Sequence, residues 1–251
     1  MAAPFDRLRV RLIQVRVRPE ILAEERASFA ARTRLRPGQF ALTNALTDPL
    51  TPDLLDGVDA VMIGGAGAYS VTRTYGWTDD LARLCHACAE RALPLFGTCW
   101  GHQFIARAFG GLVVNDPSRH EMGTHEVELT EAGEADPLFA PFPRRFRAQM
   151  GHQDRVAVLP DGATELARND AAPYQAFRLG GLPVYGTQFH SELDEAAVRA
   201  RLLAYRAHYP EMAHDAAFQA TLDGLRPTPD VDDLLYRFLR LYAVAEADRV
   251  G

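Results

Sequence analysis

The sequence contains no lysine, so all 27 of its basic residues are arginines. This absence excludes any mechanism that needs a lysine nucleophile or a lysine base. Cysteine is also scarce, because three residues are too few, and odd in number, for a disulfide framework. Cys85 and Cys88 lie in a helical stretch with no second ligand pair nearby, so we interpret them as small packed side chains rather than as half of a metal site or a redox pair.

Long apolar runs and an excess of positive charge are missing too. No stretch approaches the roughly 18 apolar residues that a membrane span needs, and the N-terminal residues lead into a strand pattern without the apolar core of a signal peptide. The net charge of −6 argues against nucleic acid and anionic membranes as partners. We therefore expect a cytoplasmic protein that binds neither.

The first half of the sequence alternates strand patterns with helix patterns, which predicts a parallel sheet covered by helices on both faces. Later segments read as short strands and then as helices. The expected fold is α/β: a three-layer sandwich with a mostly parallel central sheet, an antiparallel extension and extra C-terminal helices. The expected strands are 8–17, 39–46, 58–63 and 94–98, then short ones between 112 and 189, and the expected helices are 19–34, 78–92, 100–109, 194–208, 215–225 and 230–245.

No linker, repeat or low-complexity tract interrupts the 251 residues. We expect a single domain over 1–251, with a C-terminal helical extension from about 194 to 251. The last helix carries an apolar stripe at helical spacing. Two interpretations of this stripe stay open, packing on the parent domain or docking to another subunit. Its members are Leu234, Leu235, Phe238, Leu239 and Tyr242.

An apolar strand pattern ends at Gly97-x-Cys99-x-Gly101, and a helical pattern follows at once. This is the layout of a nucleophile elbow, in which a sharp strand-to-helix turn carries the nucleophile. Glycines two residues to either side relieve the crowding of such a turn. The turn places Cys99 at a helix N-terminus, where the positive end of the helix dipole favours thiolate over thiol. We predict that Cys99 is a catalytic nucleophile.

A second segment supplies a base and its orienting group. His190 and Glu192 are two residues apart in an extended pattern, so their side chains point to the same face. A carboxylate can then hold one imidazole nitrogen while the other faces the thiol. The predicted catalytic set is Cys99, His190 and Glu192. Paired metal-ligand spacings such as H-E-x-x-H are absent, so we expect no catalytic metal.

Three ordered segments resemble the class I glutamine amidotransferases with a Cys-His-Glu triad, and in particular the glutaminase domain of GMP synthase and its free-standing relatives. They are G-T-C-W-G-H-Q at 97–103, G-H-Q-D-R-V at 151–156 and Q-F-H-S-E at 188–192. Ala66 and Ser191 stand where members of that family often carry proline. The resemblance implies no cofactor.

The resemblance also implies roles around the triad. The developing oxyanion needs N–H donors, and the backbone of Trp100, the residue after the nucleophile, supplies one. Gly65 in the Gly64–Gly67 loop is the second donor by analogy with the family. Gln103 matches a substrate-contacting position. The backbone at Gly151, His152 and Gln153 is expected to border the amino-acid end of the substrate.

The implied reaction is hydrolysis of the side-chain amide of L-glutamine through a cysteinyl thioester, giving glutamate and ammonia. No phosphate-binding G-x-x-x-x-G-K-[ST] motif occurs in this sequence, so an enzyme that consumes the ammonia is either a separate synthetase subunit or does not exist. Two alternatives stay open. One is a stand-alone γ-glutamyl hydrolase that acts on larger γ-glutamyl amides, and the other is a regulatory subunit without turnover.

Overall fold

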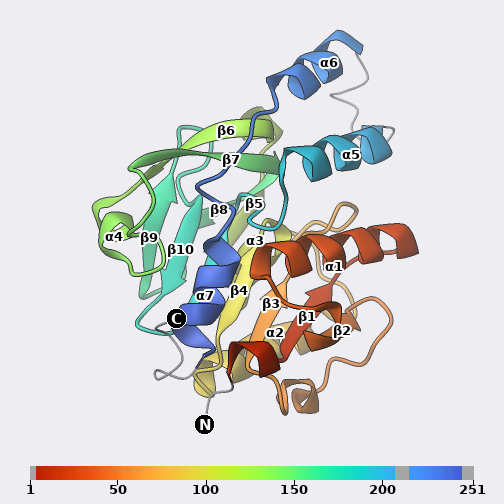
Figure 1. The fold of residues 1–251 in the computed structure, drawn as a ribbon, viewed down its shortest axis with the longest axis vertical. Helices are drawn as coiled ribbons and strands as arrows, with labels where there is room; N and C mark the ends of the chain where they lie inside the picture. Colours follow the sequence, from red (N-terminus) through yellow and green to blue (C-terminus); the bar gives the residue numbers. More distant parts are fainter. Residues whose placement is uncertain (1–3, 207–214, 245–251) are drawn as a thin grey trace.

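The fold of this computed structural model is built on one large sheet, and the structure describes residues 4–206 and 215–244. The sheet has nine strands in the order β2-β1-β3-β4-β11-β10-β9-β6-β7 (Figure 1). Its first five strands pair in parallel, which confirms the predicted parallel centre. They are β2 (Phe40–Asn44), β1 (Val10–Gln14), β3 (Ala60–Ile63), β4 (Leu95–Thr98) and β11 (Val184–Thr187).

The other four strands of the sheet form the antiparallel extension that was expected. They are β10 (Ala176–Leu179), β9 (Ala163–Arg168), β6 (Glu121–Leu129) and β7 (Arg145–His152). A separate antiparallel pair joins β5 (Leu112–Asn115) to β8 (Asp154–Val158). The sequence interpretation missed β8, because its single Asp-Arg-Val-Ala-Val segment reads as part of a motif-bearing turn.

Helices cover both faces of the sheet, as the three-layer prediction requires. On one face, α1 (Pro19–Thr33) and α7 (Leu234–Tyr242) bury their apolar side chains against Leu12, Met62 and Phe96. On the other face, α2 (Thr78–Glu90) and α3 (Trp100–Ala108) pack on Ile13, Ile63 and Leu95. The central parallel strands β3, β4 and β11 are therefore buried on both sides, which explains their mostly apolar sequence.

The apolar stripe of the last helix is buried in the described structure. Leu234, Leu235, Phe238 and Leu239 are fully covered by the sheet and by α1. The docking interpretation of this stripe is wrong, because these four side chains are not available to a partner. The helix itself is shorter than the expected 230–245, because residues 229–233 form turns and residues after 244 lie outside the described part of the chain.

The two preceding helices, α5 (Glu195–Tyr205) and α6 (Asp215–Gly224), form a small apolar cluster of their own near one end of β6 (Figure 1). The cluster packs Leu202 of α5 against Phe218 and Leu222 of α6. Asp194 caps α5, because its carboxylate accepts a hydrogen bond from the Ala197 N–H at 2.8 Å. This cap sets the direction of α5 two residues after Glu192. In the described residues, no helix is both long enough and apolar enough to cross a membrane.

Candidate active site

Cys99 lies at a strained turn between β4 and α3. Its backbone has φ 48° and ψ −102°, a conformation that residues with a side chain rarely adopt. The flanking glycines are required by close packing. A Cβ added to Gly97 would overlap the backbone of Gly101, and a Cβ added to Gly101 would overlap the carbonyl of Ile63 on β3. The elbow geometry predicted from the sequence is therefore present.

His190 follows β11, the strand that pairs with β4, so the pairing brings residues 99 and 190 to the same edge of the sheet. The backbone N–H of His190 donates to the Gln149 carbonyl at 2.9 Å, which fixes the turn. Its Nδ1 lies 2.8 Å from Oε1 of Glu192. Nε2 faces Gly151, since a Cβ on that glycine would lie 3.3 Å from it, and the Cys99 thiol also faces Gly151, with Sγ 3.7 Å from its carbonyl oxygen.

Inside the protein, His190 and Glu192 each stabilise the charged form of the other. Burial disfavours the imidazolium, but the Glu192 carboxylate and the neighbouring Cys99 sulfur outweigh it and raise the pKa of His190 from 6.5 to about 10. Burial likewise opposes ionisation of Glu192, but His190 and then Arg201 lower the pKa of this carboxyl to about 2. At neutral pH the resting site therefore holds a charged His190 and a charged Glu192.

Arg201 links this pair to α1. It projects from α5, with Nη1 3.6 Å from Oε1 of Glu192. Its Nη2 donates to the Glu24 carboxylate on α1 at 2.8 Å. The guanidinium thus approaches the same carboxylate oxygen that His190 contacts. Sequence reasoning missed Arg201, because nothing in the local pattern of α5 distinguishes it from the neighbouring arginines.

A second ion pair supports the loop that follows β3. Arg16 donates to Oε1 of Glu25 through Nε at 3.2 Å and Nη2 at 2.9 Å, and both side chains are buried. A Cβ on Gly64 would lie 2.7 Å from that carboxylate, so a larger residue there would displace the Glu25 side chain. Gly65, the predicted second oxyanion donor, lies against the site, because a Cβ there would be 3.4 Å from Cε1 of His190 and 4.0 Å from Cβ of Cys99.

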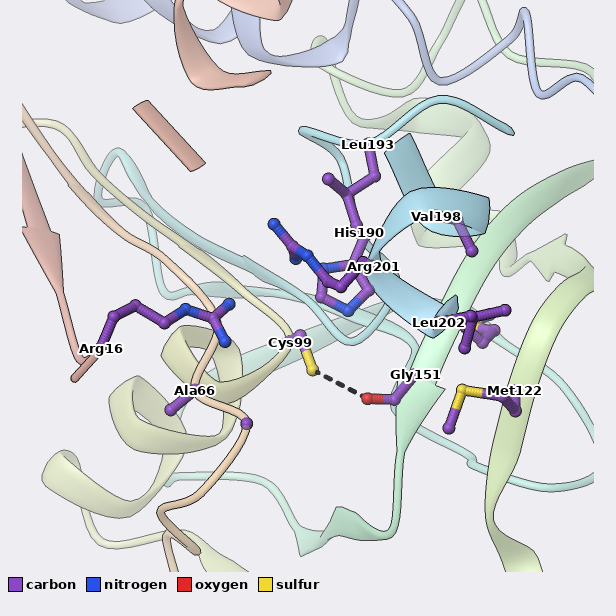
Figure 2. Close-up of a pocket in the computed structure, with 12 residues that line it drawn as sticks. Arg16, Ala66, Cys99, Met122, Gly151, His190, Leu193, Val198, Arg201 and Leu202 are labelled. Carbon is purple, nitrogen blue, oxygen red and sulfur yellow. Dashed lines mark hydrogen bonds between the residues drawn. The ribbon is translucent and has the colours of Figure 1, made fainter. Parts of the chain in front are cut away.

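Cys99 lines two cavities of different character. The larger, of about 440 Å³, is polar and is bounded by the loop after β3 and by Trp100, Gln103 and Asp154. The smaller, of about 40 Å³, is bounded by His190, Met150 and residues of α5 (Figure 2). Trp100 is the first residue of α3, and the first N–H groups of a helix have no partner within it. Its backbone can therefore serve an oxyanion on the side of the larger cavity.

The predicted substrate residues border the larger cavity, but two of them have side chains held by other groups. Gln103 donates through Nε2 to the Asp154 carbonyl at 2.6 Å and to Oε1 of Gln188 at 3.0 Å. His152 is buried, with Nε2 3.0 Å from Oε2 of Glu121. Gly151, His152 and Gln153 line this cavity, and the substrate roles of all four residues stay predictions.

The remaining candidate groups have side chains that are hydrogen-bonded or buried. Asp154 accepts from Ser70 Oγ at 2.5 Å and from Asn115 Nδ2 at 2.8 Å, so its carboxylate ties the loop after β3 to β5. Cys85 and Cys88 are free and buried on α2. Burial raises the pKa of the Cys88 thiol to about 12, which leaves it unreactive at neutral pH. The described residues hold no cluster of three or more His, Cys, Asp or Glu side chains that would suit a metal ion.

Comparison with known proteins gives a consistent result. The profile of the family described as glutamine amidotransferase class-I matches residues 32–207. The chain is similar to a glutamine-hydrolyzing GMP synthase subunit of Pyrococcus abyssi, with 39% identity over 116 residues, which is 46% of this chain and 60% of that protein. It is also similar to the corresponding subunit of Methanosarcina barkeri, with 34% identity over 158 residues, 62% of this chain and 76% of that protein.

Some of these likenesses are partial. The matched segment spans 60% of the Pyrococcus abyssi protein and 21% of the GMP synthase of Thermosipho africanus. Among solved structures, a glutamine amidotransferase from Thermotoga maritima superimposes with a TM-score of 0.71 and 22% identity, covering 94% of this chain and 99% of that one. At that identity the likeness supports the fold.

Proposed function

The chain belongs to the class I glutamine amidotransferase family, and from that premise we propose that it hydrolyses the side-chain amide of L-glutamine to glutamate and ammonia. One observation carries the proposal. The thiol of Cys99 and the imidazole of His190 line one cavity, and the imidazole is held at 2.8 Å by Glu192. Nucleophile, acid–base group and orienting carboxylate are the three parts that amide cleavage through a thioester needs.

The first half of the proposed reaction is attack by the Cys99 thiolate on the glutamine carboxamide carbon. The backbone N–H of Trp100, and that of Gly65, would stabilise the oxyanion that forms. His190, charged at rest because Glu192 and Cys99 raise its pKa to about 10, donates its proton to the departing nitrogen. Ammonia leaves, and a γ-glutamyl thioester remains on Cys99.

The second half is hydrolysis of the thioester. His190, now neutral, removes a proton from water as the water attacks the thioester carbon, and the thiolate leaves. Glu192 stabilises the imidazolium that forms again and keeps Nε2 directed at the reacting atoms. No group outside Cys99, His190, Glu192 and the backbone donors is needed for these steps.

The proposal also concerns the protein that consumes the ammonia. Relatives of this chain are named as subunits of GMP synthase, which supports a partner that is a separate synthetase chain. Their names refer to glutamine hydrolysis, so we take glutamine, and not a larger γ-glutamyl amide, as the substrate. The presence of all three triad residues also argues against a regulatory subunit without turnover.

The test combines a glutamine turnover assay with covalent labelling of cysteines. The purified protein is incubated with L-glutamine, and ammonia and glutamate are measured. In parallel, a glutamine analogue with an electrophilic carbon is used to label cysteines, which are then mapped by mass spectrometry. We expect Cys99 to be labelled in a manner that L-glutamine protects, and Cys99→Ser to lower ammonia release by about 1000-fold or more. The matched control is Cys88→Ser, which removes a buried thiol distant from the reaction. Turnover that survives Cys99→Ser would overturn the mechanism.

A further inference from the structure

The smaller cavity beside Cys99 has a lining that differs from that of the larger cavity. It and the larger cavity share Cys99, Ala66, Gly67, Met122 and Gly151 as a common wall. His190 lines only the smaller cavity, whereas Trp100 lines only the larger one. The two groups that act on opposite sides of a scissile amide therefore face different spaces.

The separation of the two cavities fixes how the substrate lies in the site. This inference rests on the glutamine hydrolysis proposed above. The carbonyl oxygen of the substrate must lie near the oxyanion donors, so the γ-glutamyl part occupies the larger, polar cavity. The departing nitrogen must lie within reach of the His190 proton, so it faces the smaller cavity. The smaller cavity is then the space that receives the amine half of the cleaved bond.

The walls of the smaller cavity select a particular kind of amine. Apolar side chains form most of the lining, namely those of Met122, Met150, Leu193, Val198 and Leu202. Arg16 and Arg201 complete it, and no carboxylate is among the described residues of the lining. Both guanidinium groups are already paired with glutamates outside the lining, Arg16 with Glu25 and Arg201 with Glu24, so an ammonium cation would find no anionic partner in the cavity. A neutral amine with a short alkyl chain needs no such partner and meets apolar surface.

Size gives a further limit. The free volume is about 40 Å³, and a cavity needs roughly 10–15 Å³ to hold one water molecule. The cavity thus has room for a molecule as small as methylamine or ethylamine, and a longer chain would extend beyond it unless a side chain is shortened.

We propose that this cavity is an acceptor site for small neutral primary alkylamines, and that the protein transfers the γ-glutamyl group of glutamine to them. The amine nitrogen attacks the carbonyl carbon of the γ-glutamyl thioester on Cys99 and forms a C–N bond. Neutral His190 takes one proton from the attacking nitrogen. The C–S bond breaks, and the sulfur leaves as the thiolate beside the imidazolium. The products are a γ-glutamyl alkylamide and free enzyme, and no electron transfer or further reactant is involved.

This transfer reverses the geometry of the first half-reaction, with the alkylamine in the place that ammonia has left. Apolar walls favour an alkyl group over water in the same space, because burying the alkyl surface is favourable while water loses hydrogen bonds there. Transfer to the amine therefore competes with hydrolysis of the thioester.

The experiment measures how the thioester partitions. The protein and L-glutamine are incubated at about pH 9, where more of an alkylamine with a pKa near 10 is neutral, with methylamine, ethylamine or butylamine. Ammonia, glutamate and γ-glutamyl alkylamide are quantified by mass spectrometry. We expect alkylamide formation that saturates with ethylamine and is weak with butylamine, together with a matching decrease in the glutamate formed per ammonia released.

Two variants on α5 locate the site. Leu202 is 4% exposed and lines the cavity, whereas its neighbour Leu203 is 55% exposed and does not. Leu202→Ala enlarges the cavity, so the preference for butylamine over ethylamine is expected to rise by about tenfold or more. Leu203→Ala is the matched control and should leave that ratio unchanged. The amine series with the unmodified protein decides the proposal even if Leu202→Ala does not fold.

The outcomes separate this inference from the proposed function. If glutamine gives neither ammonia nor labelling of Cys99, the hydrolytic function itself fails. If ammonia is released but no alkylamide forms, glutamine hydrolysis stands and the acceptor site is refuted. Alkylamide that forms in linear proportion to every amine, without saturation and with no response to Leu202→Ala, would show attack from open solvent and would also refute the site.

Discussion

At the scale of single residues, the backbone of Cys99 combines a reactive side chain with a costly conformation. A non-glycine residue at φ 48° and ψ −102° costs about 1–3 kcal/mol. Packing around Gly97 and Gly101 enforces the conformation, because the strand, the turn and the first turn of α3 touch each other directly. The thiol is thereby held toward the cavities, with its position fixed before substrate arrives.

The pKa of His190 leads to a prediction on the pH dependence of turnover. Glu192 is the strongest group that raises this pKa, while burial lowers it. Glu192→Gln removes the charge and keeps the shape, so the pKa of His190 should fall from about 10 toward or below its ordinary 6.5. The imidazolium that protonates the leaving nitrogen would then be lost at lower pH.

We therefore expect Glu192→Gln to move the high-pH decline of ammonia release to lower pH and to reduce kcat by about 100-fold to 10,000-fold. The measurement is a pH–rate profile from pH 5 to 10 for both proteins, with Glu195→Gln on the surface of α5 as the control. A variant that lost activity equally at every pH, with no movement of the profile, would speak against the assigned role of Glu192.

At the scale of elements, the close contact of α3 with β3 and β4 depends on glycine. A Cβ on Gly101 would overlap the Ile63 carbonyl, and the backbone of β3 cannot withdraw without breaking its strand pairing. Gly101→Ala is expected to lower the free energy of unfolding by about 1–3 kcal/mol and to displace Cys99, which reduces turnover as well. Gly38, which has open space around its missing Cβ, is the control.

Urea denaturation of Gly101→Ala and Gly38→Ala, followed by circular dichroism, measures the difference. The Gly38→Ala protein should unfold at nearly the same urea concentration as the unmodified chain. Equal stability of the two variants would mean that α3 can move away from the sheet without cost.

Much of this architecture was predictable from the sequence, because buried elements have recognisable patterns of apolar residues. The central parallel strands are apolar on both faces, and the elbow and the His-x-Glu pair each lie within a few residues of chain. Ion pairs between segments that are separated in the sequence have no such local pattern. Arg16 and Glu25 are separated by 9 positions, and Arg201 and Glu24 by 177. In a chain with 27 arginines, nothing local marks these two as parts of the site.

The predicted substrate residues illustrate the same limit. Gln103 and His152 were selected by position in a motif, and both line the larger cavity. Their side-chain hydrogen bonds to Gln188 and Glu121, however, depend on which strands lie side by side. Which strands are neighbours depends on the order of the strands in the sheet, and the periodicity of the sequence does not predict that order.

At the scale of the whole molecule, the C-terminal helix α7 completes the core on one face of the sheet. Phe238 is fully buried, with its ring centroid 5.1 Å from that of Phe96 on β4 and 5.9 Å from that of Tyr185 on β11. Phe238→Ala is expected to lower the free energy of unfolding by about 3–5 kcal/mol, because it leaves a cavity between the helix and the sheet. Leu203→Ala, at an exposed position, should change it by about 0.5 kcal/mol or less.

Thermal and urea unfolding of the two variants checks this prediction, and glutamine turnover of the folded protein is measured alongside. Since α7 contributes no residue to either cavity beside Cys99, the Phe238→Ala protein that remains folded should keep most of its activity. A Phe238→Ala protein as stable as the unmodified chain would show that α7 is not part of the core.

The position of α7 also bears on how the protein is made. The ribosome releases residues 234–242 only after every strand has been synthesised, and until then the side chains of Phe96 and Tyr185 lack the cover that Phe238 gives them. A nascent chain would expose this apolar surface throughout most of its synthesis. Chaperone binding is therefore expected to persist until the last helix emerges, and a premature stop before it would yield an aggregating fragment rather than a smaller enzyme.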